Sequence, residues 1–186
     1  MPKPSHREKI LSSGLAVFHE QGFHGCGIQE VVNHAGVPKG SFYNHFKSKE
    51  AFGLEVLESY WQAGGGARAE LQAAGVAPLK RIDRHLVAVG YDKNGCLIGN
   101  FSSELAGSDD FRSHLSKLYK TWISEVAACI KEGQKDGTIR DDDRAENLAE
   151  FVVEALEGAK LKAKVEREPA VLKRYRKSIR LFLQSR

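Results

Sequence analysis

Residues 35–50 read Ala35-Gly36-Val37-Pro38-Lys39-Gly40-Ser41-Phe42-Tyr43-Asn44-His45-Phe46-Lys47-Ser48-Lys49-Glu50, and they contain the most informative structural pattern of the sequence. Gly36 suits a tight turn with positive φ after one helix, and Pro38 suits the opening of the next. Phe42 and Phe46 are four residues apart, so they share one face of a helix over 39–46. The stretch therefore predicts two short helices joined by a tight turn, which is the geometry of a helix-turn-helix.

Outward from this stretch, apolar residues recur with helical spacing along nearly the whole chain. Helices are predicted upstream over 5–21 and 28–35, and Ser48 can cap a helix that should kink, fray or flex at the glycines 64–66. Further helices are predicted from Pro78, over 96–106, from Asp109, from the acidic run 141–143 and from Pro169. We expect an all-α protein of about nine helices. A three-helix helix-turn-helix domain would occupy residues 1–50, and a helical bundle for ligand binding and dimerisation would occupy residues 51–186.

Composition excludes several classes of protein. The net charge is +4, which permits a polyanionic partner without requiring one. No apolar run approaches the length of a membrane helix, and no apolar leader core follows Met1, so we expect a cytoplasmic protein that does not bind a membrane. The three cysteines are far apart and odd in number, which argues against a disulfide framework and a zinc site. The acidic run 141–143 is typical of helix capping, so no metal and no cofactor is expected.

The exposed face of the predicted second helix of the motif fits double-stranded DNA. Lysines can neutralise phosphates, while hydroxyl, phenol and imidazole groups can reach phosphates or base edges. An asparagine there can pair with adenine through two hydrogen bonds. The predicted DNA-binding residues are Gln29, Lys39, Ser41, Tyr43, Asn44, His45 and Lys49.

These residues carry a resemblance to a known family. Gly22-Phe23, Ile28, Val31, the run 35–46 and Ser48-Lys49-Glu50 resemble the N-terminal signature of the TetR/AcrR family of transcriptional regulators. The resemblance covers about residues 5–52. It implies an all-α homodimeric repressor that binds a palindromic operator and has a divergent C-terminal domain for an inducer. It also implies DNA contacts at Lys39, Tyr43, His45 and Lys49. The chain has Cys26 and Gly27 where the family usually has Thr or Ser, so a hydroxyl cap or phosphate contact should be missing.

A second resemblance lies in the C-terminal half. Gly95-Cys96-Leu97-Ile98-Gly99-Asn100-Phe101, with Glu104-Leu105-Ala106, is similar to a segment of N-ethylmaleimide-responsive and acrylate-responsive repressors of the same family. We assign Cys96, Asn100, Trp61 and Trp122 to a ligand or sensor site. If Gly95 caps the helix, Cys96 lies in its first turn, where the helix dipole favours the thiolate. A buried, inert cysteine in an ordinary pocket is the alternative.

Two other functions stay open, and an oligomer is expected. A small thiol enzyme could use Cys96, although no base or resolving thiol stands at a suitable spacing. An activator with the same motif cannot be separated from a repressor by sequence. We expect a homodimer whose interface is formed by the last two helices. Its apolar residues would be Leu148, Phe151, Val152, Leu156, Tyr175, Ile179 and Phe182.

Overall fold

The computed structural model describes residues 5–185, and it confirms the all-α class within them. Residues 1–4, on which the expectation about a leader partly rests, lie outside this range. In the described chain no helix is both long and apolar enough to pass through a membrane. The α-helices are α1 (His6–Gln21), α2 (Ile28–Ala35), α3 (Lys39–Tyr43), α4 (Lys49–Ala63), α5 (Gly65–Ala69), α6 (Pro78–Val89), α7 (Leu97–Leu105), α8 (Asp109–Lys135), α9 (Ala145–Glu166) and α10 (Ala170–Leu183), and one 3₁₀ turn, η1, covers Glu70–Gln72.

The described residues thus form ten α-helices where about nine were expected, and the extra helix is short. The helix predicted through Trp61 ends at Ala63, and α5 follows after Gly64. Consecutive glycines leave the backbone without side chains to restrict it, so a break in the helix is favoured there. The irregularity predicted for this glycine run therefore lies at Gly64, between α4 and α5.

The chain divides into two compact units. The first contains the chain up to Ala63 together with Cys96–Leu115, and so combines α1 to α4 with α7 and the start of α8. The second contains Gly64–Gly95 and Ser116–Arg186, and so combines α5, η1 and α6 with the rest of α8, α9 and α10.

Local capping explains where the first helices begin and end. Ser5 and Glu8 form a capping box at the start of α1, which lowers the pKa of Glu8. Gly27 caps α2 without a side-chain bond, as the sequence predicted, and its N–H donates to Glu30 Oε2 at 2.9 Å. Gly36 ends α2 in the left-handed conformation, with φ of 63°. The helix predicted over 39–46 was too long: α3 ends at Tyr43, and the turn that follows is closed by the N–H groups of His45 and Phe46, which both donate to the carbonyl of Phe42 at 2.9 Å.

An aromatic cluster fills the core of the first unit. The ring of Phe52 on α4 lies 5.5 Å from Phe18, 5.1 Å from Phe42 and 4.7 Å from Phe46, measured between centroids. α1 approaches α4 closely because position 14 is glycine: a Cβ there would stand 2.1 Å from Phe52 Cζ. The helix-turn-helix therefore packs on α4 through tilted and edge-to-face ring contacts.

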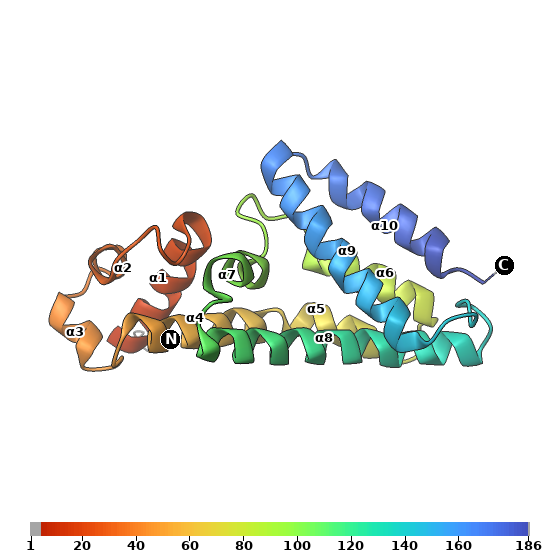
Figure 1. The fold of residues 1–186 in the computed structure, drawn as a ribbon, viewed down its shortest axis with the longest axis horizontal. Helices are drawn as coiled ribbons and strands as arrows, with labels where there is room; N and C mark the ends of the chain where they lie inside the picture. The colour runs from red at the N-terminus through yellow and green to blue at the C-terminus, as the bar shows by residue number, and fades with distance from the viewer. Residues whose placement is uncertain (1–4, 186) are drawn as a thin grey trace. The chain divides into compact units, whose positions relative to one another are not determined.

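The second unit is held by α9 and α10, which lie side by side and antiparallel (Figure 1). Tyr175 Oη on α10 donates to the carbonyl of Val152 on α9 at 2.6 Å. The guanidinium of Arg176 pairs with both carboxylate oxygens of Asp83 at 3.0–3.1 Å, which links α10 to α6. Within this unit the C-terminal helix is thus tied to two neighbours.

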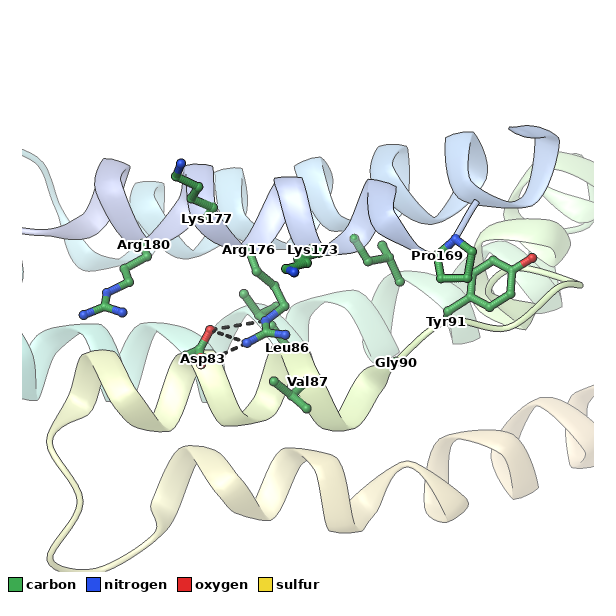
Figure 2. Close-up of a pocket in the computed structure, with 11 residues that line it drawn as sticks. Asp83, Leu86, Val87, Gly90, Tyr91, Pro169, Lys173, Arg176, Lys177 and Arg180 are labelled. Carbon is green, nitrogen blue, oxygen red and sulfur yellow. Dashed lines mark hydrogen bonds and ion pairs between the residues drawn. The ribbon is translucent and has the colours of Figure 1, made fainter. Parts of the chain in front are cut away.

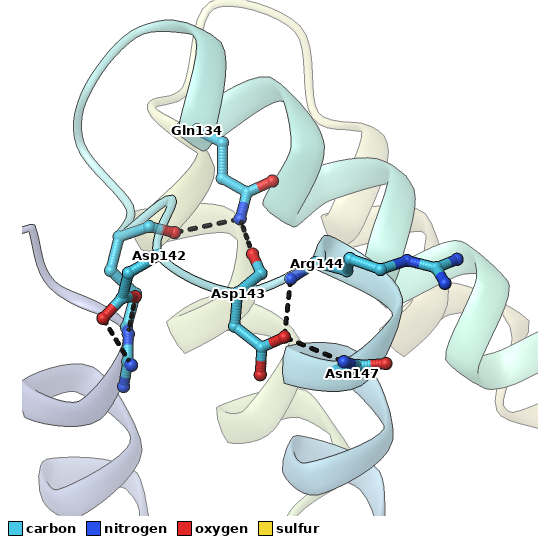
Figure 3. Close-up of polar contacts among 6 residues, drawn as sticks. Gln134, Asp142, Asp143, Arg144 and Asn147 are labelled. Carbon is cyan, nitrogen blue, oxygen red and sulfur yellow. Dashed lines mark hydrogen bonds and ion pairs between the residues drawn. The ribbon is translucent and has the colours of Figure 1, made fainter.

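The acidic run 141–143 precedes α9 rather than opening it (Figure 3). Asp143 accepts from the backbone N–H of Arg144 and from the amide of Asn147, both at 2.8 Å. Asp142 pairs with Arg140, and Gln134 Nε2 donates to the carbonyls of Arg140 and Asp143 at 2.9 Å. Asp143 stabilises the start of α9 from one residue before its N-cap, Arg144.

We expect Gly14→Ala to lower the free energy of unfolding by about 1–3 kcal/mol, because the added Cβ overlaps the Phe52 ring in a packed core. Gly66→Ala is the matched control: a Cβ at that α5 position meets nothing within 4 Å. It should raise stability by up to about 1 kcal/mol through helix propensity. Urea unfolding followed by circular dichroism measures both effects, and equal stability of the two variants would contradict the packing described for Gly14.

Candidate functional site

α2, the turn after it and α3 carry most of the residues predicted to bind DNA. Tyr43 leaves 57% of its surface exposed although its ring packs 5.4 Å from Phe42, so the phenol tip points to solvent. Ser41 is half-buried. Gln29, Lys39, Asn44 and His45 are exposed. The structure therefore gathers the polar side chains of residues 39–45 around one short helix, with apolar Phe42 turned inward.

Two side chains of this surface already have partners. Gln29 Nε2 donates to Asn33 Oδ1 at 2.8 Å, one helical turn further along α2. Ser41 Oγ lies 3.4 Å from Nδ1 of His6. His6 could not be assigned to this surface from the sequence, because no spacing pattern shows that the first turn of α1 lies beside α3. The imidazole nevertheless extends the polar surface.

Lys49, which the sequence predicts to contact DNA, makes hydrogen bonds inside the protein in this structure. Its ammonium donates to the carbonyls of Phe23 and Cys26, at 2.6 and 2.5 Å, and lies 4.5 Å from the Phe23 ring centroid. The side chain is half-buried and fastens the loop between α1 and α2 to the start of α4. Two of its three protons are thus used inside the protein, so its described contacts are structural rather than aimed at solvent.

Cys96 is itself the N-cap of α7, so the expectation that Gly95 caps this helix was wrong. Gly95 has φ of 84°, which ends the preceding turn and leaves the cap to the next residue. Cys96 is buried, and the hydroxyl of Tyr60 points at its Sγ from 3.9 Å. The thiol therefore lies inside the protein at the start of α7, next to a phenol on α4.

The four residues assigned to a sensor site do not all lie in one unit. Cys96, Asn100 and Trp61 belong to the first unit, where Trp61 is buried and Asn100 is half-buried. Trp122 belongs to the second unit and is buried on α8. Its indole N–H donates to Nε2 of His85 at 3.0 Å.

His85 is held as a neutral imidazole. Its Nδ1 lies 2.9 Å from the carbonyl of Ala67, which requires the proton on that nitrogen, while Nε2 accepts from Trp122. Burial lowers the pKa of His85, and the nearby charges of Arg68 and Lys160 lower it further, against the opposing effect of the Ala67 carbonyl. Both ring nitrogens are satisfied only in the uncharged form.

The other two cysteines are buried and disfavour the thiolate. The Sγ of Cys26 lies 3.5 Å from the carbonyl of Gly22, and burial raises the pKa of this thiol. Burial likewise raises the pKa of Cys129 to about 11, with its Sγ 3.5 Å from the carbonyl of Pro78. Cys129 is a small core residue, whereas Cys26 lies in the loop that Lys49 fastens.

The apolar residues proposed for a dimer interface differ in exposure. Leu148, Val152, Leu156 and Ile179 are buried within the chain itself, so they are core residues of one protomer, whereas Tyr175 and Phe182 are half-buried and Phe151 is exposed. An exposed apolar stripe follows one face of α9 and the end of α10 instead. It consists of Phe151, Leu161, Val165 and Leu181, which are 48%, 60%, 75% and 65% exposed. Phe151 is the one member of this stripe that the sequence analysis predicted for the interface. Leu161, Val165 and Leu181 could have been found from being apolar residues among charged neighbours.

Both halves of the chain match known protein families. A family model described as bacterial regulatory proteins, tetR family, matches residues 10–56, and a tetracyclin repressor-like C-terminal domain matches residues 84–179. The HTH-type transcriptional repressor DhaR of Mycobacterium sp. strain GP1 is 40% identical over 171 residues, covering 90% of this chain and 86% of that protein. The transcriptional regulator AcuR of Cereibacter sphaeroides is 34% identical, covering 87% and 78%. The crystal structure of reduced NemR from Escherichia coli matches with a TM-score of 0.87 and 27% identity, covering 97% and 98%.

We expect the stability of the protein to fall as pH decreases below about 6.5, because the unfolded chain then protonates His85 and the folded chain does not. The folded pKa lies below the unfolded one, so the unfolded state binds more protons between them. The slope from this group approaches at most about 1.4 kcal/mol per pH unit. Urea unfolding at about pH 7.5 and about pH 5.5 should show a smaller pH dependence for His85→Gln than for the wild type. Equal pH dependence of the two proteins would contradict this assignment.

Proposed function

Because the chain belongs to the TetR family of bacterial regulatory proteins, we propose that it represses transcription by binding a two-fold symmetric operator and that a small molecule or reactive electrophile releases it. The family and the similar proteins are transcriptional regulators rather than enzymes, so a thiol enzyme built on Cys96 is not supported. The observation that carries the proposal is the exposed polar surface of α3 on a packed helix-turn-helix.

In the DNA-binding part of the proposal, α3 enters the major groove. Lys39 and the phenol of Tyr43 contact phosphates, and Ser41 and His45 reach phosphates or base edges. Asn44 pairs with adenine, and Gln29 contributes from α2. We assign this task to residues 1–50, and ligand binding and dimerisation to residues 51–186.

The dimer in this proposal uses the exposed apolar stripe of Phe151, Leu161, Val165 and Leu181. Large apolar side chains with this much exposure gain free energy from burial against a second copy. A two-fold axis places the same stripe on both protomers, and it presents two recognition helices roughly 34–36 Å apart to a palindromic site. Homodimers are typical of the family.

Cys96 is the residue we propose for effector sensing, supported by its place in the first unit. α7, which Cys96 caps, packs against α1 and α4. Phe101 on α7 lies 5.9 Å from Phe18 and 5.8 Å from Phe23. An adduct on Cys96 adds volume beside Tyr60 and displaces α7, and Phe101 transmits the displacement to the helices that position the helix-turn-helix.

We expect Lys39→Gln to weaken binding to all DNA sequences and to reduce the slope of log affinity against log salt by about 1, since one phosphate contact is lost. Lys49→Gln is the matched control with the same change of charge. It should keep the salt slope but lower the free energy of unfolding by about 2 kcal/mol, because two charged hydrogen bonds to carbonyls are removed. Fluorescence anisotropy with operator DNA between about 50 and 200 mM salt measures the affinity. The same titration should show two chains bound to each operator. A salt slope that falls for Lys49→Gln and not for Lys39→Gln would reverse the two assignments.

We expect N-ethylmaleimide to lower operator affinity of the wild type at least about tenfold, which corresponds to about 1.4 kcal/mol of coupling. Cys96→Ser should keep its affinity after treatment, while Cys26→Ser should respond like the wild type. Cys26 is the necessary control because alkylation beside α2 would disturb the DNA-binding helices directly. The adduct is located by peptide mass spectrometry. Full response of Cys96→Ser, with loss of response in Cys26→Ser, would refute sensing at Cys96.

A further inference from the structure

A groove in the second unit lies between α6 and α10 and has a volume of about 460 Å³ (Figure 2). Leu86 and Leu172 are buried apolar residues of its lining, and Val87 adds a side chain that is 50% exposed. Tyr91 and Pro169 lie together at one end. The groove is large enough for a small organic molecule, and its lining offers an apolar surface to such a molecule.

The rim of the groove is strongly cationic. Lys173, Arg176, Lys177 and Arg180 follow the spacing i, i+3, i+4, i+7 and so share one face of α10, while Asp83 is the sole carboxylate in the described lining. Both oxygens of Asp83 are engaged by the guanidinium of Arg176. Across residues 5–185 no carboxylate pairs with Lys173, Lys177 or Arg180. Three cations therefore surround an apolar surface without a balancing charge.

A second pocket of the same unit has no such excess of positive charge in its lining. That pocket also has a volume of about 460 Å³ and contains apolar Ile123. Its two lysines, Lys120 and Lys131, are matched by Glu146 and Glu150. The two pockets have equal size and differ in net charge, which makes the second a control for the first.

We infer that the groove between α6 and α10 binds an amphipathic organic anion, a molecule with an apolar body and a carboxylate head. The apolar body covers Leu86, Val87 and Leu172, and the head lies between Lys173 and Arg180 beside the Arg176–Asp83 pair. Charged hydrogen bonds are stronger next to an apolar surface than in water. A bare polyanion would use the cations and leave the apolar lining exposed, so the lining favours a ligand with a hydrocarbon or aromatic part. None of the residues assigned to DNA or to the effector lies in this groove.

Octanoate is the probe for this site. Two control ligands each lack one of its features: octan-1-ol lacks the negative charge, and inorganic phosphate lacks the apolar body. Isothermal titration calorimetry of the full-length protein should show saturable octanoate binding. Affinity for octan-1-ol and for phosphate should each be at least about tenfold lower, since each gives up one half of the interaction. No octanoate binding, or binding of either control ligand as tight as that of octanoate, would overturn the inference.

Variants locate the site. Lys173→Gln/Arg180→Gln should weaken octanoate binding at least about tenfold, and Val87→Glu should abolish it by placing a carboxylate on the exposed apolar lining. Lys120→Gln/Lys131→Gln removes the same charge from the pocket of equal volume and should leave octanoate affinity unchanged. Octanoate binding that survives both groove variants, or that falls equally in the control, would refute this location. Operator affinity without octanoate should be unchanged in all these variants, so the outcome is independent of the DNA-binding proposal.

Discussion

The packing of Phe52 against Gly14 and its three aromatic neighbours is the interaction on which the DNA-binding unit depends. α3 has five residues, too few for a helix to be stable in water without tertiary contacts. It keeps its place because Phe42 and Phe46 lie against Phe52, and α1 approaches the same ring where a side chain would collide with it. The exposed polar residues of α3 are therefore positioned from α4.

Much of this unit could be predicted from the sequence, because its signals are local. Helical spacing, Ser5 with Glu8, Gly36 and the glycine run after Ala63 each act through neighbours a few residues away. Lys49 could not be predicted in the same way. Its sequence position gives a charge near a helix start, while its partners are carbonyls more than 20 residues earlier, fixed by the course of a loop. The N-cap of α7 was predicted wrongly for a related reason. A glycine before a helix can be its N-cap or can end the preceding turn with a positive φ, and the sequence does not distinguish the two.

The apolar stripe shows a second limit of sequence reasoning. α9 is apolar on more than one face, and periodicity finds the apolar positions without saying which face meets the protomer's own core. Leu148 and Val152 pack inside, whereas Leu161 and Val165 remain exposed. The buried face of α9 meets α10, and Arg176 on α10 pairs with Asp83 on α6, a contact between residues 93 positions apart that periodicity cannot reveal.

Each unit of the chain contains one of its two tryptophans, and both indoles are buried. Indole emission responds to the polarity and motion of its surroundings, so the protein carries an intrinsic spectroscopic probe in each half. Trp61 reports on the unit that holds the helix-turn-helix, and Trp122, bonded to His85, reports on the other. Replacing either one with phenylalanine leaves a single emitter, and the unfolding or ligand response of the two units can then be followed separately without an attached dye.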